Sequence, residues 1–238
     1  MIFKKMFRGQ EKTLRGGKNP VNEKMEHALR LIKEKKYERA ARELDRAISE
    51  EPDNPAGYTN FGNLLVAMGD PARAPAFFKK ALSLDPAYAS ASFGYGNALY
   101  ETGKYKDAMA QFVLAQKNGL NEGDLFYMIG LSALRLNHLG QALAAFQRAV
   151  ELNGSDGEAR FQYGLALAQF GQIDSAKTQF LTVIKGNQNH ADAYYNLGVI
   201  AMRQDRPSDA RRYFKQALAH HPGHILAAHG LKQLKKPE

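Results

Sequence analysis

The chain has 238 residues, of which 44% are hydrophobic, and it contains no cysteine. This hydrophobic share is enough for a continuous core and argues against global disorder. The lack of cysteine excludes disulfides, thiolate metal ligands and cysteine nucleophiles, and it fits a reducing compartment. No window approaches the roughly 18 consecutive apolar residues of a membrane span, and charges interrupt the position where a secretory signal has its apolar region. We therefore expect a cytoplasmic protein.

More than half of the formal net charge of +9 falls in residues 1–20. The basic residues there are Lys4, Lys5, Arg8, Lys12, Arg15 and Lys18, with Glu11 as the acidic residue. Apolar residues lie between the charges at Ile2, Phe3, Met6 and Phe7. This amphipathic pattern suits an anionic membrane surface or a nucleic acid. Because Gly16-Gly17 breaks the pattern and basic termini are common, we interpret residues 1–20 as a flexible solubilising tail and keep surface binding as the alternative.

The rest of the sequence repeats with a period of 34 residues. A small residue recurs at Ala28, Gly62, Gly96, Gly130, Gly164 and Gly198. An alanine recurs at Ala40, Ala74, Ala108, Ala142, Ala176 and Ala210. A large apolar residue recurs at Leu44, Phe78, Phe112, Phe146, Phe180 and Phe214. A fourth column holds Ala47, Ala81, Ala115, Ala149, Val183 and Ala217. The columns divide the chain into six repeats, 21–54, 55–88, 89–122, 123–156, 157–190 and 191–224.

Each repeat has the composition of two helices joined by a turn. We number the places within a repeat from 1 to 34, so that the small residue is at place 8 and the large apolar residue at place 24. Small residues at places 8, 20 and 27 allow two helices to approach closely. Asp70-Pro71 predicts a helix N-cap followed by proline at the first helical position, and Asp85-Pro86 predicts a helix end. Pro75 lies inside a predicted second helix, close to its start, where the loss of one donor is tolerable.

These columns resemble those of the tetratricopeptide repeat (TPR) family over about nine-tenths of the chain, and the match is close in the segment from Ala191 to His224. The resemblance implies an all-α fold, a right-handed superhelical solenoid of six helix pairs. It also implies a concave groove lined by the first helix of each pair. Because the ends of such a stack need capping, we expect a final capping helix within residues 225–236, with an apolar stripe of Ile225, Leu226, Leu231 and Leu234 and with lysines facing water.

The resemblance places the groove at places 2, 5, 6, 9, 12 and 13 of the first helices, and these places share one helical face. The candidate peptide-binding residues are Asn60, Asn63, Phe93, Asn97, Tyr100, Tyr127, Leu131, Arg135, Phe161, Leu165, Tyr195, Asn196, Val199 and Arg203. We expect the place 5 aromatic residues to be partly exposed, although aromatic stripes at helical spacing are more often core. Asparagine suits a groove because one side chain both donates and accepts hydrogen bonds. Acidic residues occupy place 2 in the last three repeats, at Asp124, Glu158 and Asp192. A role as favourable charges at helix N-termini explains them at least as well as a role in ligand binding.

Two family features are altered in this sequence. The carboxylate clamp of chaperone-binding members uses a lysine at place 5, and no repeat has one. We therefore do not expect this protein to bind the C-terminal tails of chaperones. Place 4 is aromatic in several repeats but is Arg160 in the fifth. Its guanidinium must extend to water or to a carboxylate, and we expect it either to reach the groove or simply to be tolerated at this place.

No catalytic, cofactor or metal chemistry is predicted. The histidines, which include His190, His220, His221, His224 and His229, have no spacing typical of a metal site, and His190 and His224 both occupy the last place of a repeat, which indicates a turn role. No nucleophile–base pair has sequence support. We expect a non-catalytic adaptor that binds a peptide or helix of another protein, with a second copy of the chain as an open alternative partner. The alternative function is a membrane- or nucleic-acid-associated assembly factor localised by residues 1–20.

Overall fold

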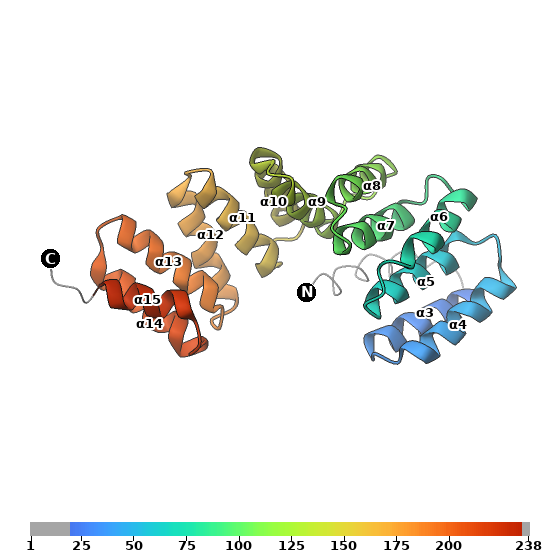
Figure 1. Cartoon of the computed structure of the whole chain (residues 1–238), viewed down its shortest axis with the longest axis horizontal. Helices are drawn as coiled ribbons and strands as arrows, with labels where there is room; N and C mark the ends of the chain where they lie inside the picture. Colours follow the sequence, from blue (N-terminus) through green and yellow to red (C-terminus); the bar gives the residue numbers. More distant parts are fainter. Residues whose placement is uncertain (1–19, 235–238) are drawn as a thin grey trace. The chain divides into compact units, whose positions relative to one another are not determined.

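The computed structural model describes residues 20–234, which form thirteen helices and no strand (Figure 1). The basic tail predicted for residues 1–20, the end of the predicted cap and the membrane-surface alternative thus fall almost entirely outside the described residues. The chain separates into two units, Met1–His138 and Leu139–Glu238, and each is described below by itself. Within the described residues, no helix combines the length and the apolar character needed to cross a membrane.

The first unit contains seven of these helices, each packed on the next along the chain. They are α3 (Pro20–Lys33), α4 (Tyr37–Glu50), α5 (Pro55–Ala67), α6 (Ala74–Leu84), α7 (Ala89–Glu101), α8 (Tyr105–Lys117) and α9 (Gly123–Arg135). The first helices of the predicted pairs also contact one another, since α5 touches α3 and α7, and α7 touches α9. They form a layer of first helices alongside the layer of second helices (Figure 1).

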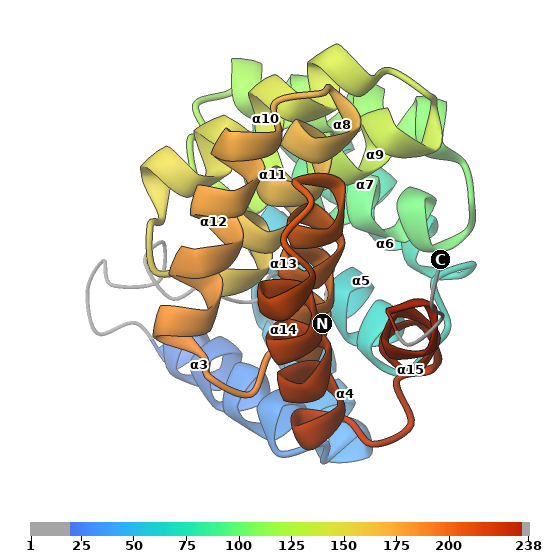
Figure 2. The same ribbon diagram turned by 90° about the vertical axis from the view of Figure 1, so that its left-hand side faces the viewer.

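The second unit contains the remaining six helices of the described chain. They are α10 (Leu139–Leu152), α11 (Gly157–Gln169), α12 (Ile173–Gly186), α13 (Ala191–Arg203), α14 (Pro207–His220) and α15 (Ile225–Gln233). Neighbouring helices pack against each other throughout, and α15 also touches α13 (Figure 2). The all-α solenoid character predicted from the 34-residue period is confirmed.

The beginnings of the first helices follow the sequence period. From α5 to α15 each one begins 34 residues after the last, at Pro55, Ala89, Gly123, Gly157, Ala191 and Ile225. The residue before the helix is its N-cap, and four of these side chains accept a bond from a main-chain N–H of the first turn, namely those of Asn54, Asp156, His190 and His224. The turn role predicted for the two histidines is therefore confirmed.

The start of one helix was predicted wrongly. Helix α6 starts at Ala74 instead of Pro71, and its N-cap position is taken by Arg73. The reason is Pro75, whose ring would clash with the preceding turn of a helix that began at residue 71. With the later start, Pro75 falls in the first turn, where its missing N–H has no helical partner to lose. The Asp70 carboxylate accepts a bond from Arg73 and does not cap the helix.

A common turn ends every first helix up to α13. The residue at place 15 has a positive φ in each case, at Lys35, Gly69, Gly103, Asn137, Gly171 and Asp205. The next N–H bonds back to the carbonyl five residues earlier, as from Asp70 to Leu65 and from Lys104 to Leu99. This is the Schellman arrangement, which satisfies the last carbonyls of the helix. Glycine suits it because it has no Cβ to clash in the left-handed region.

Lys35 is the least suitable residue in this column, with φ 58°. A left-handed conformation costs a non-glycine residue roughly 1–2 kcal/mol. We expect Lys35→Gly to stabilise the chain by about 0.5–1 kcal/mol, after allowance for the extra freedom of glycine in the unfolded state. Denaturant titration measures the change. Asn137→Gly is the control, and it should give a smaller gain because asparagine tolerates this region well; equal gains would contradict the explanation.

The core is built around the place 24 phenylalanines, which are fully buried. A Cβ placed on the place 8 glycine would lie 2.8 Å from Phe78 at Gly62, 2.4 Å from Phe112 at Gly96, 2.8 Å from Phe180 at Gly164 and 2.5 Å from Phe214 at Gly198. Each ring therefore occupies the space that a side chain at place 8 would fill. The two helices of a pair can be this close only where place 8 is glycine.

We expect Gly198→Ala to destabilise the chain by about 1–3 kcal/mol, because the new methyl group overlaps the buried Phe214 ring. The control is Gly140→Ala near the start of α10, where no atom lies within 4 Å of the added Cβ. That change should be neutral or stabilising by up to about 1 kcal/mol, because alanine is the better helix former. Thermal or denaturant unfolding that gave the same sign for both changes would refute the close-packing account.

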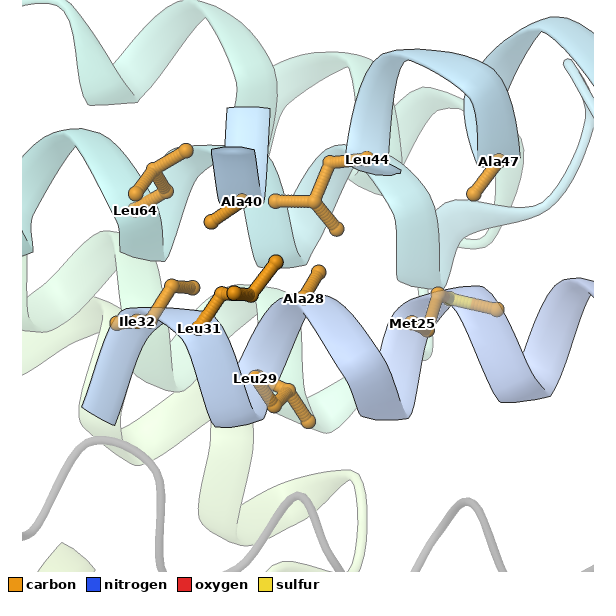
Figure 3. Packing of buried hydrophobic residues seen from close by; sticks show 9 residues of the cluster. All are labelled: Met25, Ala28, Leu29, Leu31, Ile32, Ala40, Leu44, Ala47 and Leu64. Atoms are coloured by element: carbon orange, nitrogen blue, oxygen red, sulfur yellow. The ribbon is translucent and has the colours of Figure 1, made fainter. Parts of the chain in front are cut away.

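The first pair uses different residues for the same purpose. Its place 8 and place 24 residues are Ala28 and Leu44, and both are buried in one cluster with Ala40, Ala47 and Leu64. Figure 3 shows Ala28 of α3 facing Leu44 of α4, whereas Leu29 points to the opposite side of α3. Place 9 is therefore directed away from the second helix, as the predicted groove requires.

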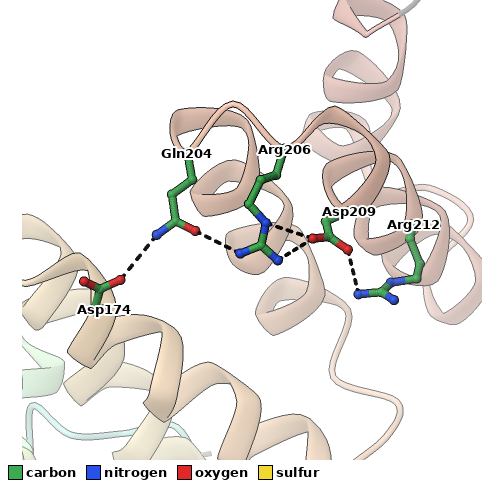
Figure 4. A network of polar contacts seen from close by, with 5 residues as sticks. All are labelled: Asp174, Gln204, Arg206, Asp209 and Arg212. Carbon is green, nitrogen blue, oxygen red and sulfur yellow. Dashed lines mark hydrogen bonds and ion pairs between the residues drawn. The ribbon is translucent and has the colours of Figure 1, made fainter.

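Polar contacts join successive pairs at one edge of the second unit (Figure 4). Gln204 at the end of α13 donates to Asp174 of α12 at 3.3 Å, and Arg206 donates to the Gln204 side chain and to Asp209. Arg212 also contacts Asp209, at 3.0 Å. The hydrogen bonds from Arg206 lower the pKa of Asp209. The contribution of this half-buried carboxylate to stability is therefore present above its ordinary pKa and is lost as the pH falls through the lowered value.

The last helix differs from its predicted packing. Ile225 and Leu226, expected on a buried stripe, are 81% and 57% exposed. The buried residues of α15 are Ala227 and Gly230, and Gly230 lies against the Phe214 ring. The small residues of α15 are the buried ones because the space beside Phe214 admits no larger side chain.

Candidate functional site

The candidate site is the face of the first helices that carries places 5, 9, 12 and 13. Each unit bears its own stretch of this face. In the second unit it includes Leu165 of α11 together with Tyr195, Val199 and Met202 of α13, and all four are half-buried. These residues are packed at the edges of the buried clusters around Phe180 and Phe214. A half-exposed apolar strip on helices with rigidly packed backs is a surface that can take an apolar ligand.

Polar groups border the strip of the second unit. Arg203 is exposed at the last turn of α13. The Asn196 amide donates to the carbonyl of Asp192 one turn earlier, at 2.8 Å, so part of its hydrogen-bonding capacity is used within the helix. The Asp192 carboxylate lies 3.2 Å from Nε2 of the capping residue His224. Because Nδ1 of that ring accepts a main-chain bond, Nε2 is the nitrogen that carries hydrogen and faces the carboxylate.

The place 5 aromatic residues are more deeply packed than the sequence predicted. Phe161 is only 8% exposed and Tyr127 only 4%, whereas Phe93 and Tyr195 are half-buried. The Phe161 ring lies 5.6 Å from Phe180 and 4.6 Å from the His190 ring, between centroids. Tyr195 packs on Phe214 in the same way, at 5.9 Å. The expectation that these residues are partly exposed is therefore wrong for Phe161 and Tyr127 and holds for Phe93 and Tyr195. At place 5 of α11 and α13 the aromatic ring covers the place 24 ring of its pair.

We therefore expect Phe161→Ala to destabilise the chain by about 3–5 kcal/mol, as for a core aromatic residue. Val199→Ala, on the half-exposed strip, should cost no more than roughly 1 kcal/mol. Circular dichroism during denaturant unfolding measures both. If the two variants lose similar stability, Phe161 is a surface residue and the packing described above is incorrect.

The stretch of face in the first unit is polar and closed. Asn63 of α5 and Asn97 of α7 occupy place 9 of successive repeats, and each is 1% exposed. Neither the amide nitrogen nor the amide oxygen of either residue has a hydrogen-bond partner among the described residues. Leaving a buried polar group unpaired costs about 1–3 kcal/mol. Asn60, also buried, lies one turn before Asn63.

An arginine and two tyrosines lie together at the edge of the same stretch. Arg135 of α9 is exposed, and its guanidinium lies 5.7 Å from the centroid of the Tyr105 ring. Its Nε donates a long bond, 3.5 Å, to the Tyr100 hydroxyl, and this bond raises the pKa of Arg135. The rings of Tyr100 and Tyr105 meet edge to face, 5.2 Å apart. The structure thus brings together Tyr100 and Arg135, both predicted from the sequence, and adds Tyr105. Leu131, on the same helix as Arg135, is half-buried.

Arg160 belongs to the packing and not to the groove. Its guanidinium donates to the Gln179 side chain of α12 at 2.8 Å and to the Gly154 carbonyl at 3.0 Å. Place 4 therefore faces the second helix of its own pair. In the third repeat the same two places hold Ser92 and Gln111, and a buried oxygen of each has no hydrogen-bond partner in the described chain.

No group of three or more histidine, aspartate or glutamate side chains with the geometry of a metal site comes together within residues 20–234. Among the described histidines, His190 and His224 cap helices, His27 is half-buried within α3, and the others are exposed.

Comparison with known proteins defines the class. Family models for the tetratricopeptide repeat match residues 31–77, 65–122, 127–176 and 164–225, which together cover most of the chain. The chain belongs to the tetratricopeptide-repeat family, whose members bind other proteins. Neither matching model describes a catalytic domain. No protein with a curated description matches the sequence.

Among solved structures, the chain is similar to YrrB, described as a TPR protein with an unusual peptide-binding site. The two share 41% identity and a TM-score of 0.71 over 79% of this chain and 97% of YrrB. PilF of Pseudomonas aeruginosa has a TM-score of 0.80 at 20% identity, over 91% of this chain and 97% of that one. MamA has a TM-score of 0.64 at 24% identity, over 68% and 94%. At these identities the last two show the fold alone.

Proposed function

We propose that this protein is a non-catalytic adaptor that binds a segment of a partner protein along the exposed face of its first helices. The observation that carries the proposal is the strip of Leu165, Tyr195, Val199 and Met202, which stays half-exposed although the helices beneath it are fully packed. Helices α11 and α13 are held by their second helices, so the strip is preformed. Its mixture of apolar side chains with a bordering arginine is typical of a protein-binding surface.

The likeness to YrrB supports the proposal. Because 97% of YrrB is covered at 41% identity, a peptide-binding role is the natural inference for this chain as well. The groove residues predicted from the sequence, from Asn60 to Arg203, remain the proposed contact set. Phe161 and Tyr127 enter it as supports, since they are too deeply buried to offer much contact area.

The test introduces a charge into the strip. We expect Val199→Glu to remain folded, because the residue is half-exposed, and to weaken binding of the partner by about 2 kcal/mol or more, as for a central contact of an interface. Partners captured by crosslinking to the unaltered chain are identified by mass spectrometry, and their affinities are then measured by calorimetry. The matched control is Leu181→Glu on α12, where the leucine is 39% exposed but lies on a second helix.

Equal binding by the two variants would place the contact elsewhere. Salt then distinguishes the alternative function, in which residues 1–20 bind a membrane or a nucleic acid. Binding driven by basic residues falls steeply with ionic strength, whereas binding to the apolar strip should change little between low and high salt.

A further inference from the structure

The turn between α10 and α11 contains an asparagine followed by a glycine, Asn153 and Gly154, at places 31 and 32 of the fourth repeat. Place 32 is proline in three other repeats, at Pro52, Pro86 and Pro222. Since proline has no N–H, this turn does not need a hydrogen bond from place 32. The N–H of Gly154 accordingly has no acceptor among residues 20–234.

The side-chain amide of Asn153 is polarised by a neighbouring hydroxyl. The Ser155 side chain donates a hydrogen bond to Oδ1 of Asn153 at 2.8 Å. A donor at this oxygen withdraws electron density from the amide carbon Cγ. It also stabilises the negative charge that would develop on Oδ1 if a nucleophile attacked Cγ.

The peptide bond between Asn153 and Gly154 is polarised as well. The main-chain carbonyl of Asn153 accepts the N–H of Asp156 at 3.1 Å. Hydrogen bonds of this kind polarise the groups on both sides, so the N–H of Gly154 is easier to deprotonate. Because Gly154 has no side chain, its nitrogen is also unhindered. An unbonded nitrogen nucleophile and an activated amide carbon therefore lie on adjacent residues.

We propose that Asn153 is a site of spontaneous covalent modification, at which the chain converts its own asparagine into aspartate and isoaspartate. The Gly154 nitrogen loses its proton to solvent and attacks Cγ of Asn153, which closes a succinimide ring. The bond between Cγ and Nδ2 breaks, and Nδ2 takes a proton from solvent and leaves as ammonia. Water then opens the ring at either carbonyl carbon, which gives aspartate or isoaspartate.

The isoaspartate product disturbs the start of α11. It lengthens the main chain by one methylene in the turn that positions Asp156, whose side chain caps two N–H groups of the first helical turn. It also displaces the Gly154 carbonyl, which accepts a bond from Arg160 at 3.0 Å. Because Leu165 lies on α11, the change reaches the apolar strip. This last consequence rests on the proposed function, whereas the modification itself does not.

The chain contains two internal controls. Asn118 also precedes a glycine, but the N–H of Gly119 donates to the Gln116 carbonyl at 3.0 Å, so this nucleophile must first break a hydrogen bond. Asn187 lies at place 31 of the fifth repeat but is followed by Gln188, whose side chain hinders the attacking nitrogen.

The test follows the full chain during prolonged incubation at neutral and mildly alkaline pH, with and without urea. Mass spectrometry of proteolytic fragments measures the conversion of each amide into an acid. In the folded chain we expect Asn153 to react about tenfold faster than Asn118, the equivalent of one hydrogen bond, and Asn187 to remain unmodified. In urea the rates at Asn153 and Asn118 should become similar, because both residues precede glycine. Both rates should rise with pH, because the attacking nitrogen must lose a proton.

Two variants test the contributing groups. Ser155→Ala removes the donor to Oδ1 and should slow the reaction at Asn153 by about tenfold, with no effect at Asn118. Gly154→Ala should nearly stop the reaction while the fold is kept, since the nearest atoms to an added Cβ lie 3.6 Å and 3.7 Å away. After incubation the unaltered chain should unfold about 2–4 °C lower, as for the loss of a helix cap, and the Gly154→Ala chain should not change.

Three results would overturn the proposal. They are equal rates at Asn153 and Asn118 in the folded chain, a reaction at Asn153 that folding slows as much as the one at Asn118, and an undiminished rate in Ser155→Ala. None of these measurements involves a partner protein, so failure of the proposed function in the Val199→Glu experiment would leave them unchanged.

Discussion

The contact on which the rest of the structure depends is that between a glycine at place 8 and a phenylalanine at place 24. The ring fills the space of the missing side chain, so the distance between the two helices of a pair is set by one residue on each. Alanines at places 20 and 27 keep the flanking turns equally close. Phe78 and Phe214 are also approached from the next first helix, at Gly94 and Gly230. A single ring thus holds together a pair and its neighbour, which is how a repeat too small to form its own core shares one.

The opposite face of the first helices differs between the two units. In the second unit the face is apolar and half-exposed. In the first unit it carries Asn63 and Asn97, buried and unpaired. Groups that reduce stability without an internal partner are a common mark of a binding site, where function and stability compete.

The place 5 residues connect the core with this face. Phe161 and Tyr195 cover the phenylalanine of their own pair and reach the histidine that caps the next first helix. A place 5 residue therefore contacts both the buried core and the surface of the first helices. Substitution of a place 5 residue is therefore expected to disturb folding, and the half-exposed Val199 is the better probe of the proposed binding.

The sequence by itself determined the helices, because a 34-residue period with glycine, alanine and phenylalanine columns admits one packing of paired helices. It also determined where the first helices start, the turns at place 15 and the helix caps, because these features depend on local main-chain hydrogen bonding. The tertiary structure alone decided what the side chains on the first helices touch. The start of α6, the partners of Arg160, the burial of Phe161 and the exposure of Ile225 follow from neighbours distant along the chain, or from steric limits that outweigh a local capping signal. Asn63 and Asn97 show this most clearly. The sequence supplied an amide at the same place of two successive repeats, but only the packing of the helices left both amides buried without partners, because hydrogen-bond satisfaction depends on surrounding atoms and not on residue type.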